Sequence, residues 1–229
     1  MKKTNKKLFF TVLLLGFVLI FSNSCKKDDS SNASTAITDY DGNVYHSITI
    51  GTQIWMVENL KTTHYNDGTA IPNVTDNTWG SLTTPALCWY SNNAINKDPY
   101  GALYNWYAAS NSKLCPTGWH VPTANEWATL ITSLGGESVA GGKLKEAGTA
   151  HWKTTITGVD NSSGFTALPG GCHNTDNIFY AIETYGWWWS SMESSSTEAW
   201  HIYLQNTTTA VTSTSGSKSL GFSVRCIKD

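Results

Sequence analysis

The sequence predicts an α+β domain built from short strands, two main helices and long loops. Two observations support this class. Turn signals such as Asp41-Gly42 separate short alternating runs early in the chain, and a well-capped helical segment follows near its middle. Residues 37–229 are enough for one domain with its own hydrophobic core, which leaves residues 1–36 as leader and linker.

The first part of the domain has the pattern of antiparallel strands. Asp41-Gly42 lies between Ile37–Tyr40 and the alternating run Val44–Ile50, which predicts a hairpin because this dipeptide favours tight turns. Gly51-Thr52 then leads into a third strand, Gln53–Glu58. Residues 75–85 and 91–99 are rich in Asn, Thr, Asp and Pro and are expected to be loops.

Two helices are predicted in the middle of the chain. Tyr100–Ala109 would place Leu103, Trp106 and Tyr107 on one face. Ala124–Leu134 carries stronger signals, since Thr123 and Glu126 have capping-box spacing and two glycines follow the last turn. Its apolar stripe has helical spacing and consists of Trp127, Leu130, Ile131 and Leu134.

The C-terminal half is predicted to hold short strands between long loops. Five segments fit this description: Gly164–Leu168, Gly186–Ser191, Ala199–Leu204, Ala210–Ser213 and Leu220–Cys226.

The N-terminus has the pattern of a lipoprotein signal peptide, residues 1–24. Four lysines precede Leu8–Phe21, an apolar run of 14 residues that is shorter than the roughly 20 residues of a membrane-spanning helix. Cys25 follows Ser22-Asn23-Ser24, which resembles a relaxed lipobox, so Cys25 is the predicted lipidated first residue and the contact with the membrane. The alternative is a short uncleaved anchor with an incidental cysteine.

Residues 25–36 are predicted to be a flexible tether, because this polar run has no apolar surface to bury. Lys27-Asp28-Asp29 resembles the surface-export signal of Bacteroidetes lipoproteins. We therefore expect an outer-membrane lipoprotein displayed on the cell surface. A solvated linker on a periplasm-facing lipoprotein is the alternative.

Composition argues against nucleic acid as a partner. Four of the 15 basic residues lie in the signal peptide and none of the 17 acidic residues does, so the mature chain carries 11 minus 17, or −6. Arg225 is the only arginine. The chain has 11 Trp and 10 Tyr, which serve equally well as core or as exposed platforms for sugars.

Several motifs, in this order and spacing, resemble the Fibrobacter succinogenes major paralogous domain over residues 37–229. They are GTQIWMVENLKTTHYNDGTAIP (51–72), YGALYNWYAA (100–109), LCPTGWHVPTANEWATL (114–130), GGKLKEAG (141–148), GFTALPGG (164–171), WWWSSMES (187–194) and GFSVRC (221–226).

This family is similar to the C-type-lectin-like fold as used by formylglycine-generating enzymes. There the pattern R-L-P-T-x-x-E-W is similar to residues 120–127, and a G-F-R segment is similar to residues 221–225. The resemblance implies a C-type-lectin-like fold but carries no established activity. Those enzymes use two closely spaced C-terminal cysteines that bind copper, whereas Cys226 is the only cysteine after Cys172.

The resemblance also implies a disulfide between Cys115 and Cys226, since such folds commonly tie the helix region to the last strand. By number alone, the four cysteines of the domain allow three sets of two disulfides, and all four could also remain thiols. Cys88 and Cys172 are expected to be buried free thiols, although they could form a second bridge. No CxxC spacing indicates zinc.

No cofactor or metal site is predicted. The tripeptides of lectin calcium sites are missing, and Asn92, Asn93, Asn96 and Asp98 are more typical of turns than of a calcium loop. The six histidines lack ligand spacing, and His120 is expected to be packed and bonded to backbone. A glycosidase pair of Glu126 and Glu193 has little support, because Glu126 already caps a helix.

Trp187-Trp188-Trp189 is the strongest candidate for ligand contact. Alternate residues of a strand face opposite sides, so Trp188 is expected on one face and Trp187 and Trp189 on the other, with a role in the core favoured over ligand contact. We expect a lipid-anchored binding or adhesion domain for polysaccharide or glycoprotein. The alternatives are an enzyme of unknown type acting on extracellular polymer and a passive surface-coat protein.

Overall fold

Short elements joined by long loops make up residues 36–229, the part of the chain that the computed structural model describes. The α-helices of this part are α1 (Lys97–Tyr100), α2 (Trp106–Ala109), α3 (Ala124–Ser133) and α4 (Glu137–Leu144). Single 3₁₀ turns are at Trp79–Ser81, Tyr90–Asn92 and Ala94–Asn96. The predicted α+β class is confirmed. The predicted signal peptide, Cys25 and most of the predicted tether lie outside the described residues.

Five small antiparallel sheets contain the strands of residues 36–229. The three two-stranded sheets are β1 (Ile37–Thr38) with β2 (Val44–Tyr45), β5 (Leu87–Cys88) with β6 (Leu103–Tyr104), and β8 (Cys172–His173) with β9 (Phe179–Tyr180). The larger ones are β10 (Tyr185–Glu193), β11 (Glu198–Gln205) and β12 (Val211–Ser217), and β3 (Ser47–Ile50), β4 (Gln53–Met56), β13 (Ile227–Lys228) and β7 (Trp119–His120).

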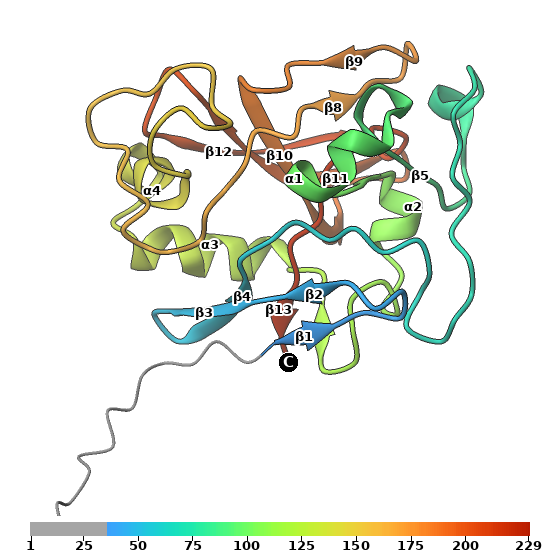
Figure 1. Ribbon diagram of the computed structural model, residues 1–229, viewed down its shortest axis with the longest axis horizontal. Coiled ribbons are helices and arrows are strands. Elements are labelled where there is room, and N and C mark those ends of the chain that lie inside the picture. Colours follow the sequence, from blue (N-terminus) through green and yellow to red (C-terminus); the bar gives the residue numbers. More distant parts are fainter. Residues whose placement is uncertain (1–35) are drawn as a thin grey trace, which may run out of the picture. The chain divides into compact units, whose positions relative to one another are not determined.

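The strands of the β10–β11–β12 sheet are the longest in residues 36–229. Each of them overlaps one of the short strands predicted at 186–191, 199–204 and 210–213. Trp188 is opposite Ile202, and Trp189 is opposite His201. A register shift between Trp189 and Glu193 marks an irregularity near the end of β10. The helix α3 contacts β10 and β11, and α4 contacts β12, so one face of this sheet is covered by helices (Figure 1).

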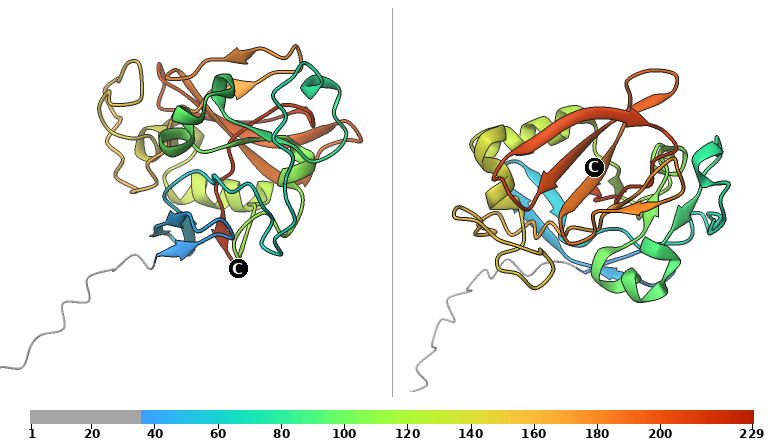
Figure 2. Two further views of the ribbon diagram at one scale, coloured as in Figure 1. Left: turned by 45° about the vertical axis from the view of Figure 1, so that its right-hand side comes forward. Right: turned by 90° about the horizontal axis from the view of Figure 1, so that it is seen from above.

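The four-stranded sheet joins the two ends of the domain. Its order is β3-β4-β13-β7, so the last strand of the chain pairs with an early one. The last segment, drawn in red, runs from the β10–β12 sheet to the blue N-terminal strands (Figure 1, Figure 2). Cys115 and Cys226 form a disulfide with 6.1 Å between their Cα atoms, which confirms the predicted pairing. Cys88 and Cys172 are buried free thiols, as expected.

The predicted capped helix is confirmed in α3. The Thr123 hydroxyl accepts a hydrogen bond from the Glu126 backbone N–H (3.2 Å), and the Glu126 carboxylate accepts one from the Thr123 backbone N–H (2.7 Å). Both bonds satisfy donors that a helix start leaves free. Trp127, Leu130 and Ile131 are buried.

The predicted helix Tyr100–Ala109 is wrong. The segment instead ends α1 at Tyr100, forms β6, and starts α2 after Asn105, whose side chain accepts a hydrogen bond from the Ala108 N–H. Gly101 has φ +77°, and a Cβ there would lie 2.7 Å from the Asn59 side chain. The close contact and the cap at Asn105 therefore override the helical spacing.

The second main helix is α4, which the sequence did not predict. Its Gly141 and Gly142 lower helix propensity. They are needed because a Cβ on Gly142 would lie 2.0 Å from the Gly158 carbonyl oxygen, and one on Gly141 would lie 2.5 Å from that of Ala210. Close backbone packing thus explains residues that obscure the helix in the sequence.

Two predicted strands are also wrong. Gly164–Leu168 makes only an isolated bridge, between Ala167 and Lys145. Leu220–Cys226 makes single bridges to three different neighbours in turn, so it is extended without forming a ladder. Its bridging residues are Gly221 with His173, Phe222 with Tyr104, and Ser223 with Trp188.

Arg225 forms a polar centre inside the fold. Its guanidinium is fully buried and donates to the Asn59 side-chain oxygen (2.8 Å) and to the Phe165 carbonyl (2.6 Å). The same Asn59 oxygen accepts the indole N–H of Trp188 (2.9 Å). Burial lowers the pKa of Arg225 to about 9, so the group stays protonated at neutral pH with oxygen dipoles around it.

Candidate functional site

The three consecutive tryptophans of β10 lie in different surroundings. As the sequence predicts, Trp188 faces the side opposite to Trp187 and Trp189. Trp188 and Trp189 are fully buried, and their indole N–H groups donate to Asn59 and to the Tyr104 carbonyl. Both therefore belong to the core. Only Trp187 is partly exposed, and it borders a cavity.

A cavity of about 460 Å³ opens beside Trp187. We call it the aromatic cavity. Its walls come from β10, β11, β12, the β8–β9 hairpin and the final segment of the chain. The lining residues are Cys172, Asn174, Tyr180, Trp187, His201, Thr214, Ser215, Gly216, Leu220 and Phe222.

Flat rings form one wall of the aromatic cavity. The Trp187 ring is nearly parallel to the rings of Tyr185, at 4.8 Å and 10°, and of Phe222, at 5.9 Å and 9°. Stacking against two rings holds the indole in one orientation. Tyr180 of the hairpin is 41% exposed and adds a second ring. The cavity therefore presents flat apolar surfaces in fixed positions.

The titratable groups that line the aromatic cavity are held in their neutral forms. His201 is only 6% exposed, and burial lowers its pKa to about 4. Burial also raises the pKa of the Cys172 thiol to about 11. No Lys, Arg, Asp or Glu lines the cavity. It therefore holds neither a thiolate nucleophile nor a histidine that titrates near neutral pH.

One polar atom in the cavity wall is left without a partner. Nδ1 of His201 is buried and makes no hydrogen bond. Such groups are rare in folded proteins, because an unpaired buried nitrogen loses its bonds to water. The hydrogen-bonding groups at His201 are therefore less completely paired than those around Trp188, whose indole N–H donates to Asn59.

The other histidines of interest have structural partners. His120 was expected to bond backbone, but its Nδ1 contacts the Asp229 carboxylate (2.7 Å) and its Nε2 contacts that of Glu126 (2.9 Å). Partial burial disfavours its charged form, but the two hydrogen bonds outweigh this and raise the pKa of His120. This cluster joins the chain's last residue to the start of α3.

Cys88 and His173 form a buried contact that does not have the properties of a catalytic dyad. The Cys88 sulfur lies 3.6 Å from His173 Nδ1. Burial raises the pKa of Cys88 and lowers that of His173, so both are neutral. A catalytic pair needs the opposite shifts, toward thiolate and imidazolium.

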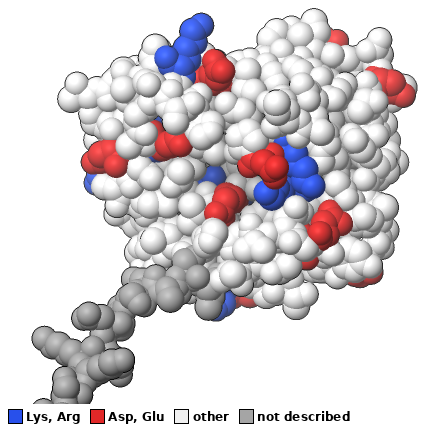
Figure 3. Space-filling model, in the orientation of Figure 1, with Lys and Arg blue, Asp and Glu red and all other residues white. Residues whose placement is uncertain are grey.

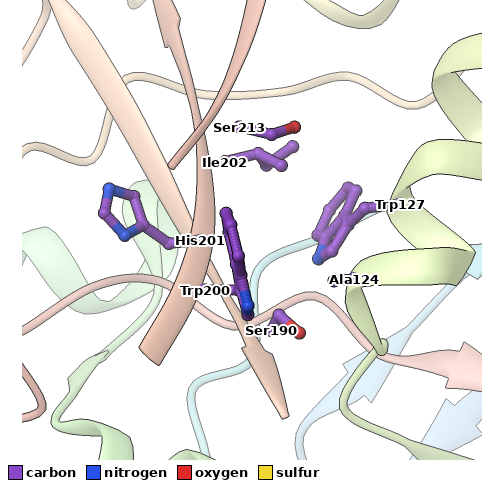
Figure 4. A pocket seen from close by; sticks show the side chains of 7 residues that line it. All are labelled: Ala124, Trp127, Ser190, Trp200, His201, Ile202 and Ser213. Carbon is purple, nitrogen blue, oxygen red and sulfur yellow. The ribbon is translucent and has the colours of Figure 1, made fainter. Parts of the chain in front are cut away.

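A second, much smaller cavity lies on the other side of β11. The rings of Trp200 and Trp127 face each other across it, while His201 projects to the opposite side of the strand (Figure 4). Its volume of about 30 Å³ suits one or two waters and is too small for a sugar ring. Trp200 is 39% exposed, the most of any tryptophan. The alternation of polar and apolar residues in Glu198–Gln205 could have indicated that Trp200 is exposed.

Residues 91–99, which include the asparagines weighed as calcium ligands, form a series of turns. Asn93 accepts a hydrogen bond from the Ile95 N–H, and Asn96 donates to the Tyr90 carbonyl. Asp98 pairs with Lys61 at 2.9 Å. Within residues 36–229 no group of three or more His, Cys, Asp or Glu side chains is placed to hold a metal ion.

Charged side chains are sparse on the face shown in Figure 3, where single acidic and basic residues are scattered over an otherwise uncharged surface. That face has no continuous basic patch of the kind that binds phosphates. In the described part of the chain, no helix is long and apolar enough to cross a membrane.

The comparison with known families identifies the domain. A family model described as the Fibrobacter succinogenes major domain matches residues 48–228. The chain belongs to this family. No curated protein and no solved structure gives a significant match. The match covers every residue that lines the aromatic cavity.

Proposed function

We propose that this member of the Fibrobacter succinogenes major domain family is a lipid-anchored, surface-displayed protein that binds carbohydrate, as polysaccharide or as the glycan of a glycoprotein. One observation carries the proposal. The aromatic cavity combines fixed flat rings with hydroxyl and amide groups, and no charged side chain lines it.

The chemistry of the cavity suits a sugar. A pyranose ring has an apolar face that packs on aromatic surface. The exposed Tyr180 ring and the uncovered part of the Trp187 ring provide such surface. Thr214 and Asn174 provide polar groups that hydrogen-bond to sugar hydroxyls. A volume of about 460 Å³ lies in the range of small-ligand pockets.

The alternative functions have less support. An enzyme acting on a polymer needs an acid, base or nucleophile at its site, and the neutral His201 and the protonated Cys172 do not fill these roles at neutral pH. A passive coat protein needs no cavity lined by ordered rings. Binding therefore fits the residues best.

The display part of the proposal depends on sequence. Cys25 would carry the acyl chains, and each buried CH₂ adds about 0.8 kcal/mol of membrane affinity, so several chains hold the protein firmly. We infer in addition that the domain has a C-type-lectin-like fold. The capped helix α3, the Cys115–Cys226 bridge and the sheet shared by β3, β4 and β13 support this inference.

A glycan array tests the binding function. The full chain, purified in detergent, is expected to bind at least one class of glycan. Trp187→Ala is expected to weaken that binding about tenfold, by analogy with the energies of aromatic pairs. Trp200→Ala is the matched control, since Trp200 is an exposed tryptophan of the same sheet outside the cavity. Binding of no glycan, or loss in the control alone, contradicts the proposal.

Membrane fractionation tests the anchor. Cys25→Ser is expected to block maturation or to release the protein from the membrane. A variant that fractionates with membrane as the parent does would indicate that Leu8–Phe21 anchors the protein instead.

A further inference from the structure

One edge of the β10–β11–β12 sheet, the outer side of β12, has unpaired backbone groups. The hydrogen bond from the Lys218 N–H to the Thr197 carbonyl fixes the alternation of the ladder between β11 and β12. Counted back from Lys218 in steps of two, the even-numbered residues of β12 bond to β11. The odd-numbered ones direct their N–H and C=O groups away from the sheet. These outward residues are Val211, Ser213, Ser215 and Ser217.

Neighbouring segments close the two ends of this edge but leave its middle free. At one end the Thr209 carbonyl accepts a hydrogen bond from α4 (3.1 Å). At the other end the chain turns, and the Ser217 carbonyl accepts a hydrogen bond within that turn (3.0 Å). In the part of the chain that the structure describes, no hydrogen bond uses the outward backbone groups of Ser213 and Ser215. We call residues 213–217 the open edge.

The opposite edge of the same sheet, on β10, is closed by other segments. The Tyr185 carbonyl accepts a hydrogen bond from the Gly171 N–H (3.0 Å), and the Trp187 carbonyl accepts one from the Ser223 N–H (3.1 Å). Proteins usually protect a free edge with a charge, a proline or a bulge. Residues 211–217 read VTSTSGS and keep a regular register with β11, so β12 has none of these protections.

We propose that two copies of this chain pair through their open edges, with antiparallel β12 strands and a two-fold axis at Ser215. In this register the open edge meets itself over its full length. Ser213 lies opposite the partner's Ser217, and outward N–H groups face outward carbonyls. The two three-stranded sheets then form one continuous sheet.

The side chains of the open edge are small on both faces of the sheet. Ser213 and Ser215 lie on the side of Trp200 (Figure 4), and Thr214 and Gly216 lie on the side of the aromatic cavity. In the proposed register Thr214 is opposite the partner's Gly216, and Ser215 is opposite the partner's Ser215. No bulky or charged side chain of β12 therefore keeps the two strands apart.

One charge lies near the proposed axis. The Glu198 carboxylate accepts a hydrogen bond from the Ser215 hydroxyl (2.8 Å), so the two-fold axis brings two copies of this carboxylate toward each other. Glu198 is exposed, and salt screens the repulsion between exposed charges. Pairing between identical copies should therefore strengthen about twofold when Glu198 is neutralised.

The size of the open edge predicts a weak dimer. It offers residues 213–217 from each copy, whereas a stable interface uses about 20 or more residues a side, so pairing should depend on concentration. A two-fold axis between antiparallel strands is perpendicular to the sheet, so both aromatic cavities open on the same face. A pair thus presents two sites to one polysaccharide, which raises avidity. Only this consequence rests on the proposed carbohydrate binding.

A cysteine at the axis tests the pairing. Cα atoms of a hydrogen-bonded antiparallel pair lie about 5.5 Å apart, which suits a disulfide. With mild oxidant, the full chain carrying Ser215→Cys in detergent is expected to form a cross-linked dimer about tenfold faster than the control Ser162→Cys. Ser162 is an exposed serine of a loop outside the sheet. Equal rates overturn the proposal.

Sedimentation of the full chain in detergent gives an independent measurement. The parent is expected to change from monomer to dimer mass as its concentration rises. Ser215→Pro should reduce the dimer fraction, because it removes an outward N–H and leaves the bonds to β11 intact. Glu198→Gln should increase the dimer fraction. Asp76→Asn, at an exposed carboxylate in a loop outside the sheet, should not change it.

The outcomes separate this inference from the proposed function. A monomer at every concentration overturns the pairing. A dimer that Ser215→Pro leaves unchanged would show that the copies meet elsewhere, and it overturns the pairing too. Thermal unfolding checks that each variant is folded, and if Ser215→Pro does not fold, the cross-linking rates decide. The glycan array measures sugar binding separately, so failure of the pairing leaves the proposed function standing.

Discussion

The two faces of the β10–β11–β12 sheet differ in their exposure to water although they belong to the same strands. On one face, Trp188 and Ile202 pack against Trp127 and Leu130 of α3 and are sealed from water. On the other face, Trp187 borders an open cavity. The contrast shows that the alternation of a strand can place one residue in the core and its neighbour in the wall of an open cavity.

The two faces also differ in how well their polar groups are satisfied. On the sealed face the indole N–H of Trp188 donates to Asn59, which in turn accepts from Arg225. On the open face Nδ1 of His201 has no partner. Satisfied groups on the sealed face contribute stability, whereas the buried, unpartnered nitrogen on the open face costs stability.

The largest expected effect concerns the disulfide beside the open face. Cys115 and Cys226 belong to the same hydrophobic cluster as Trp189 and Phe222. Replacing both cysteines with Ala should lower the free energy of unfolding by up to about 4–5 kcal/mol, because the bridge closes a loop with a sequence separation of 111 residues. Urea unfolding measures this. Unchanged stability would show that packing alone holds this region.

The next test compares neighbouring tryptophans. Trp188→Ala should cost about 3–5 kcal/mol, since it removes a fully buried ring and its bond to Asn59. Trp187→Ala should cost only about 1 kcal/mol, because its ring is only partly removed from water. Urea unfolding with a constant slope checks both. Equal losses would mean that the two faces are equally sealed.

The third test uses acid to probe the open face. The pKa of His201 is about 4 in the folded state, below the 6.5 of an unfolded histidine, so the unfolded chain binds more protons between these values. Stability should therefore fall as pH drops from 6.5 toward 4. His201 should account for about 2 kcal/mol between pH 7 and pH 5.

The variant His201→Gln isolates this contribution. The pKa of His173 is lowered too and acts in the same direction, whereas that of His120 is raised and acts in the opposite one. Subtracting the pH dependence of the variant's stability from that of the parent cancels the contributions of His173 and His120. If the two proteins lose the same stability on acidification, His201 is not buried in its neutral form.

The smallest effect concerns the helix that seals the other face. Thr123→Ala removes the acceptor that caps α3 and should cost about 0.5–2 kcal/mol. Thr129→Ala is the matched control, since Thr129 is an exposed threonine within the same helix. Thermal or urea unfolding compares them. Equal effects would mean that the cap contributes little.

Local patterns in the sequence were enough to predict a residue's role where that role depends on its near neighbours in the chain. The capping box of Thr123 and Glu126 follows from bonds between residues three apart. The apolar stripe of α3 and the opposite facing of Trp187 and Trp188 follow from the helical period of 3.6 and the strand period of 2. The motifs identified the family, and the family resemblance supplied the Cys115–Cys226 pairing.

Tertiary structure decided what depends on distant contacts. Asn59 against Gly101 and the Gly158 backbone against Gly142 determined where α1 ends and α4 packs, and neither neighbour is close in sequence. The aromatic cavity likewise draws on five separate segments, so no single motif contains it. Spacing along a chain encodes which way a side chain points on its own element, whereas a cavity forms only where several elements leave space between them.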